Sequence, residues 1–257
     1  MQSVIPQRTY QRLRTLREQA AVFERYRGFD RCLRRLGAAD PENAPLGLVA
    51  ELYAHWGDPL SQTDENYLRS CLAHAVRARG PILQCGASLL TLVLGRLCDM
   101  APNGGKTLWC LEQEPHWANT IRSWLTQYRI ASAQVIVSRP HLFDGFVWYA
   151  ADTARLPNGI ALLLCQGARA TASGVLGALT RLHGRLAPDC TVLARGVTRA
   201  DDLKRLNQWA QANGAACVVV ERQTGFVKLS LPGGTARDSG AAAADTPALT
   251  PSTGTRG

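Results

Sequence analysis

Short, mainly apolar runs alternate along the middle of the chain with longer segments whose apolar residues recur every three or four positions. The short runs are typical of buried strands, and the three-to-four spacing is typical of helices that bury one face. The pattern predicts strands at 81–85, 106–112, 133–137, 160–166 and 191–195, and helices at 89–100, 115–128, 173–186 and 199–212. Strands and helices in this alternation predict an α/β fold, with a mostly parallel sheet covered by helices on both faces.

Further elements flank this region. Residues 216–222 and 225–231 predict a closing hairpin, which would add an antiparallel strand at or near one edge of the sheet. Before the first strand, a helix capped by Thr63 or Asp64 is expected to end at Gly80.

The N-terminal segment is also expected to be helical over residues 8–36, with Gly28 as a potential break. These elements divide the chain into a basic helical N-terminal extension at 1–45, an α/β domain at 46–231 and a tail at 232–257. The tail is small, polar and dotted with proline, so it is expected to be disordered.

Charge is concentrated near the N-terminus. The chain of 257 residues has a formal charge of +9, and nine of its arginines lie in residues 1–37, at 8, 12, 14, 17, 25, 27, 31, 34 and 35. Two interpretations stay open: a solvated helix face, or a docking surface for an anionic partner such as nucleic acid or lipid headgroups.

Cysteine and histidine positions argue against metal chemistry. The eight cysteines form no C-x-x-C pair and several lie in apolar runs, while the five histidines have no metal-ligand spacing. We therefore expect reduced, buried thiols in a cytoplasmic protein and no metal site. Neither a secretory signal nor a transmembrane segment is predicted from the sequence.

The stretch ILQCGAS, residues 82–88, has the pattern of a ligand-binding turn. A buried strand leads through Gly86 into a helix, whose first N–H groups favour an anionic group. Glu112 ends the next strand, 26 positions after Gly86, where a carboxylate can accept hydrogen bonds from two ribose hydroxyls. A tight turn without a ligand and a solvated strand-end acid are the alternatives.

The stretches ILQCGAS, LWCLEQEPHW, VWYA and IALLLCQG, with the WGD run before them, resemble a bacterial group of class I S-adenosylmethionine-dependent methyltransferases. The resemblance covers about residues 50–231. It implies a Rossmann-like fold with a seven-stranded sheet in the order 3-2-1-4-5-7-6, strand 7 being antiparallel. It also implies S-adenosylmethionine as the cofactor.

The same resemblance assigns candidate cofactor contacts. Gly86, Ala87 and Ser88 would lie under the methionine and ribose portion, Glu112 would bind the ribose hydroxyls, and Gln113 and Trp117 would lie nearby.

Three departures from the family pattern bear on affinity. Gln84 stands where the family has an acid, Ala87-Ser88 replaces a Ser-Gly pair, and Gln166 replaces the carboxylate after the fourth strand. The sulfonium and ammonium of the cofactor are cationic, so losing two carboxylates removes favourable Coulomb energy. An amide can still accept a hydrogen bond from the ammonium, so weak binding, altered ligand choice and complete loss all stay open.

Three functional hypotheses follow. The first is a methyltransferase with an unknown methyl acceptor, and the second is a methyltransferase-fold protein that has lost catalysis and acts as a binding or scaffolding module. A nicotinamide-dependent enzyme is disfavoured, because G-x-G-x-x-G is absent. No catalytic base is evident; His141, Asp144, Tyr149 and Asp152 lie between the third and fourth strands, where acceptor contacts or ordinary loop roles are both open.

Overall fold

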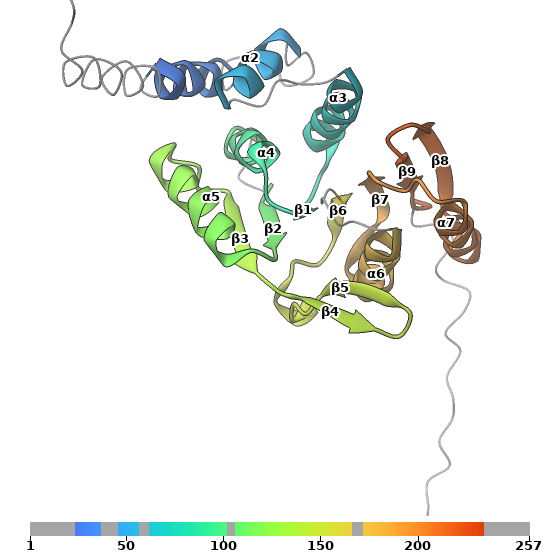
Figure 1. Ribbon diagram of the computed structural model, residues 1–257. Coiled ribbons are helices and arrows are strands. Elements are labelled where there is room, and N and C mark those ends of the chain that lie inside the picture. The colour runs from blue at the N-terminus through green and yellow to red at the C-terminus, as the bar shows by residue number, and fades with distance from the viewer. Residues whose placement is uncertain (1–23, 37–45, 57–61, 102–105, 166–171, 234–257) are drawn as a thin grey trace, which may run out of the picture.

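The computed structural model describes residues 24–36, 46–56, 62–101, 106–165 and 172–233. A seven-stranded sheet of order β3-β2-β1-β6-β7-β9-β8 runs through the molecule (Figure 1). Its strands are β1 (Ile82–Cys85), β2 (Leu108–Glu112), β3 (Ala133–Val137), β6 (Ile160–Cys165), β7 (Leu186–Ala194), β8 (Ala216–Glu221) and β9 (Phe226–Ser230).

The strand order confirms the expected topology. If the seven strands are numbered along the chain, their order is 3-2-1-4-5-7-6. The first five pair in parallel, and β9 pairs antiparallel with both β7 and β8. The closing hairpin is therefore present, with its antiparallel strand next to the edge strand.

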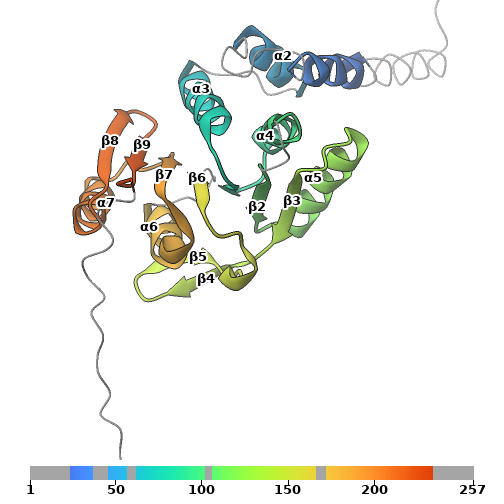
Figure 2. The same ribbon diagram turned by 180° about the vertical axis from the view of Figure 1, so that it is seen from behind.

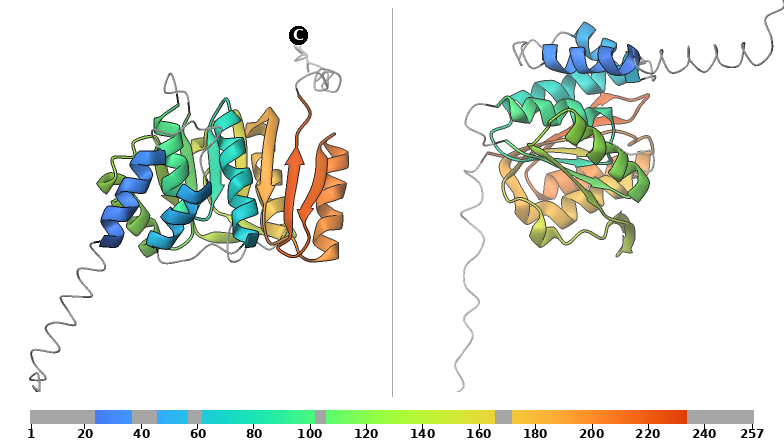
Figure 3. Two further views of the ribbon diagram at one scale, coloured as in Figure 1. Left: turned by 90° about the horizontal axis from the view of Figure 1, so that it is seen from above. Right: turned by 90° about the vertical axis from the view of Figure 1, so that its left-hand side faces the viewer.

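Each face of the sheet has its own covering layer (Figures 2 and 3). A helix over residues 24–36 shares one face with α2 (Leu46–Trp56), α3 (Gln62–Arg77), α4 (Leu89–Asp99) and α5 (Pro115–Gln127). The opposite face carries α6 (Ala172–Leu182), α7 (Ala200–Ala212) and a two-stranded hairpin of β4 (Pro140–Phe143) and β5 (Phe146–Tyr149). Short 3-10 turns lie at Thr153–Arg155 and His183–Arg185.

Two elements were not predicted from the sequence. The helix α2 buries Leu48, Val49 and Leu52, in a segment to which we assigned no element. The β4–β5 hairpin occupies a segment that we interpreted only as a connection, and it places Trp148, 3% exposed, against α6.

The expected break at Gly28 is wrong, because the helix is continuous over residues 24–36. Gly28 instead permits close packing, since a β-carbon there would overlap the imidazole of His55. Phe29, Leu33 and Leu36 of the same helix are buried in the core with α3 and α4. The earlier part of the expected helix, residues 8–23, and the tail beyond residue 233 lie outside the described residues.

Seven of the eight cysteines are buried thiols, as expected, and Cys217 is half-buried. In the described part of the chain, no group of three or more His, Cys, Asp and Glu side chains could hold a metal ion. Nor does any helix there have the length and apolar character to cross a membrane.

Candidate cofactor site

The glycine turn and the strand-end acid meet at the carboxyl ends of β1 and β2. The strand order reverses here, because β2 and β3 lie on one side of β1 and the next strand of the sheet, β6, lies on its other side. Such a point is where open α/β sheets bind ligands. Gly86 has a φ of 95° and donates its N–H to Leu111 O at 2.8 Å, which fixes the turn to β2.

The side chain of Glu112 connects the glycine turn after β1 with the segment that follows β2. One carboxylate oxygen, Oε2, accepts from Ala87 N at 2.7 Å, and Oε1 accepts from Glu114 N at 2.9 Å. The side chain is only 6% exposed. Since a carboxylate oxygen has two lone pairs, each oxygen retains one acceptor position for a ligand hydroxyl.

Trp117, on the first turns of α5, holds the same turn from the other side. Its indole Nε1 donates to Ala87 O at 2.8 Å. Ala87 is therefore fixed at both its N–H and its C=O, which makes the turn rigid and ties it to the start of α5.

A reciprocal capping box closes the N-terminus of α4. Ser88 N donates to Thr91 Oγ1 at 3.0 Å, and Leu90 N donates to Ser88 Oγ at 3.2 Å. These N–H groups, which we expected to be available to an anionic group, are thus satisfied within the chain. The role of Thr91 was missed, although the spacing Ser-x-x-Thr was a usable signal.

Gln84 lies beneath the turn and is 0% exposed. Its Nε2 donates to Gly86 O at 2.9 Å and to Ser88 Oγ at 3.3 Å, while its Oε1 accepts from Thr91 Oγ1 at 3.1 Å. The amide therefore stabilises the turn by hydrogen bonds from its buried side. Gln113 is partly exposed beside Glu112, and Gln166 lies outside the described residues.

Tyr149 on β5 comes closest to the crevice among the four connection residues. Burial raises the pKa of its phenol, and the nearby Cys85 thiol and Glu112 carboxylate raise it further, so the phenol is neutral and can donate a hydrogen bond. By contrast, His141 and Asp144 are exposed on the hairpin. Asp152 caps the following 3-10 turn, accepting from Ala154 N at 3.0 Å.

Comparison with known proteins supports the fold. Neither a protein-family model nor a curated protein matches the sequence. Among solved structures, a Corynebacterium glutamicum protein superposes with a TM-score of 0.50 at 12% identity, over 77% of this chain and 94% of that one.

Two methyltransferase structures match less closely. The O-methyltransferase TomG from Streptomyces achromogenes, in complex with SAM, has a TM-score of 0.47 at 16% identity, covering 74% of this chain and 89% of its own. An O-methyltransferase from Bacillus cereus, in complex with SAH, has a TM-score of 0.48 at 17% identity, covering 72% and 90%. With TM-scores below 0.50 and identities this low, we draw no conclusion about the chain from these two similarities.

Proposed function

We propose that the chain is an S-adenosylmethionine-dependent methyltransferase that binds its cofactor at the carboxyl ends of β1 and β2. The hydrogen bond of 2.7 Å between Ala87 N and Glu112 Oε2 carries this proposal. It joins the glycine turn and the strand-end acid, 25 residues apart, on one crevice at the point where the strand order reverses. Both parts belong to the sequence stretches that resemble the methyltransferases.

The described residues fit parts of such a cofactor. The free lone pairs of Glu112 suit two ribose hydroxyls, and the turn at Gly86 offers a rigid backbone surface beside them. The bound cofactor would supply an electrophilic methyl group, whose transfer requires alignment with the acceptor more than a nucleophilic side chain. The neutral phenol of Tyr149 is available to orient an acceptor by donating a hydrogen bond.

Calorimetric titration with S-adenosylmethionine and S-adenosylhomocysteine tests the proposal. We expect micromolar binding that Glu112→Gln weakens at least about tenfold, since a loss of about 1.4 kcal/mol corresponds to that factor. Glu114→Gln is the matched control, because Glu114 is exposed and contributes only its backbone N–H to the site. Thermal unfolding of both variants separates lost binding from lost folding. Wild-type protein that binds neither ligand at millimolar concentration would contradict the proposal.

A second candidate is a methyltransferase-fold protein that has lost catalysis and binds a partner instead. The internal hydrogen bonds of Gln84 favour it, because both N–H groups of the amide that replaces the family's acid are used within the turn, as is one lone pair of its oxygen. Binding that is absent in the wild type but restored by Gln166→Asp would support this second candidate, since the resemblance assigns a cofactor-binding carboxylate to that position.

A further inference from the structure

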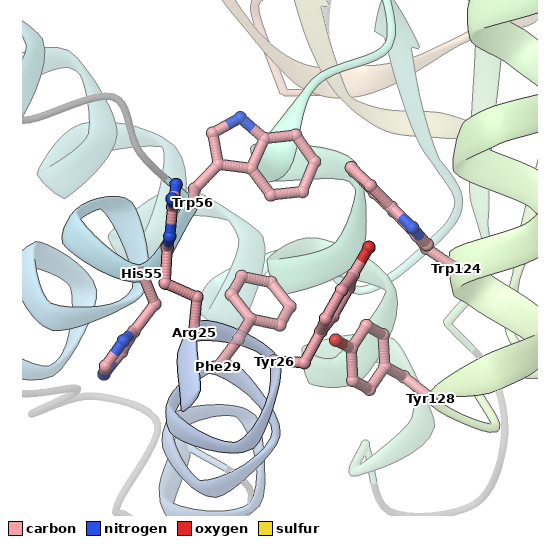
Figure 4. A pocket seen from close by; sticks show the side chains of 7 residues that line it. All are labelled: Arg25, Tyr26, Phe29, His55, Trp56, Trp124 and Tyr128. Carbon is pink, nitrogen blue, oxygen red and sulfur yellow. The ribbon is translucent and has the colours of Figure 1, made fainter. Parts of the chain in front are cut away.

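Away from the strand ends, an aromatic pocket of about 240 Å³ lies in the helical layer between the helix at 24–36, α2 and α5 (Figure 4). Its lining side chains come from all three elements: Tyr26 and Phe29 from the first, His55 and Trp56 from α2, and Trp124 and Tyr128 from the end of α5. Arg25, which also comes from the first helix, lines the same pocket.

The walls are built from mutually packed rings. The centroids of Trp56 and Trp124 lie 4.4 Å apart at an interplanar angle of 77°, and those of Phe29 and Tyr128 lie 5.2 Å apart at 51°. Phe29 is 4% exposed and Tyr128 is 6% exposed, whereas Tyr26, at 43%, stands at the opening. A buried aromatic floor with an exposed ring at its edge suits a flat apolar group that enters from solvent.

Size limits the ligand. An apolar cavity of about 150 Å³ holds benzene, and drug-sized ligands occupy pockets of about 300 Å³ or more. The volume of about 240 Å³ therefore fits one ring or two fused rings with a small substituent.

The charged groups around the pocket determine whether this substituent should be anionic or cationic. Arg25 is exposed and makes no hydrogen bond or ion pair with any described residue, and none of the described residues that line the pocket is a carboxylate. The same helix carries two acids: Glu24 is exposed and does not line the pocket, and Asp30 is paired with Arg34 at 2.7 Å. Aromatic walls alone attract cations, but the guanidinium of Arg25 opposes a cation here and favours an anion.

Tyr128 adds a neutral polar group. Burial raises the pKa of the Tyr128 phenol to about 12, with Asp30 and Tyr26 contributing, so the phenol keeps its proton at neutral pH. The neutral phenol does not repel an anion at that pH.

We propose that this pocket is a binding site for a small planar aromatic acid, whose ring lies against Trp56, Trp124 and Phe29 and whose anionic group pairs with Arg25. The site is separate from the crevice at Glu112, and the proposal does not depend on methyl transfer.

Calorimetry with three matched naphthalene probes tests the proposal on the full chain: 2-naphthoate, the uncharged 2-naphthalenemethanol and the cationic 2-naphthylmethylammonium. We expect 2-naphthoate to bind most tightly. Arg25→Gln should weaken its binding about fivefold, as expected for one partly exposed charge pair, and leave 2-naphthalenemethanol within about twofold.

Two further variants locate the site. Tyr26→Ala, which removes an exposed ring from the opening, should weaken both 2-naphthoate and 2-naphthalenemethanol. Arg31→Gln is the control, because Arg31 is exposed on the same helix and does not line the pocket. The proposal is overturned if 2-naphthoate does not bind at millimolar concentration, if the cation binds as tightly, or if Arg25→Gln and Arg31→Gln have the same effect.

Discussion

The amide of Gln84 has different partners at its two ends. Its nitrogen donates to the carbonyl of Gly86, and its oxygen accepts from the hydroxyl of Thr91. A carboxylate could keep the second bond but has no hydrogen for the first, and its charge would face a carbonyl oxygen in a site without solvent. The neutral amide therefore satisfies the hydrogen-bonding groups of this turn without a ligand.

Gln84→Glu is expected to lower the free energy of unfolding by ~3 kcal/mol at neutral pH. In the unfolded chain a glutamate titrates near pH ~4.3, and burial against a carbonyl raises that pKa in the folded protein. Because the folded state then holds the proton more tightly, the loss is small below that pH and grows as the pH rises. Urea unfolding across this range measures the effect. Gln113→Glu, at a partly exposed position, should show no such trend; equal trends in both variants would refute the argument.

Cysteine reactivity offers a second test at this scale. Burial raises the pKa of Cys71 and Cys190 to about 12, so almost no thiolate forms at mildly alkaline pH. The pKa of Cys217 is raised as well, but its half-buried side chain is accessible on β8. Iodoacetamide at about pH 8 should therefore label Cys217 first in the native protein, as read by peptide mass spectrometry. Rapid labelling of Cys71 before Cys217 would contradict this order.

The packing of the β4–β5 hairpin against the neighbouring helix α6 depends on the absence of a side chain at Gly177. A β-carbon at Gly177 would come within 2.7 Å of Phe146 Cδ2 and 2.8 Å of Trp148 Cβ. The second of these atoms is close to the backbone of a buried residue, so it cannot move aside without shifting the strand. This glycine sets how closely the hairpin approaches the helix.

Gly177→Ala should accordingly lower the free energy of unfolding by ~1–3 kcal/mol, the usual effect of overpacking a core. Gly174→Ala is a control on the same helix, since a β-carbon there meets only Val147 O at 3.9 Å. That variant should be neutral or gain up to ~1 kcal/mol from helix propensity. Thermal and urea unfolding compare the two, and similar stabilities would show that the hairpin tolerates the added atom.

Local pattern explains which elements could be predicted from the sequence. Buried strands such as β6 and helices such as α4 have clear patterns, so their types and nearly their ends could be inferred. The β4–β5 hairpin could not be predicted, because its burial depends on close packing against Gly177, which is a contact between segments distant in the chain. The proximity of Glu112 to the turn was predictable from strand order. The inward orientation of Gln84 was not, because Thr91, whose hydroxyl donates to the amide oxygen, becomes its partner only in the folded turn.

At the scale of the whole molecule, the described part of the basic N-terminal segment forms ion pairs and also packs into the core. Arg34 and Arg35 form ion pairs with Asp30 and Glu51, at 2.7 and 2.9 Å. The same helix buries Phe29 and Leu33 in the core. Deleting residues 1–37 would therefore expose core surface as well as remove charge, so charge replacement is the cleaner test of an anionic partner.

We predict that the arginines at 8, 12, 14 and 17, which lie outside the described residues, strengthen retention on immobilised duplex DNA at low salt. Replacing all four with glutamine should reduce retention at about 0.05 M salt, and the difference should fade towards about 0.5 M as the charges are screened. The control replaces four exposed arginines elsewhere, Arg79, Arg139, Arg199 and Arg222, which changes the net charge equally. Because both variants lose the same charge, an N-terminal surface predicts a larger loss for the first, whereas equal losses would mean that only the net charge of the protein matters.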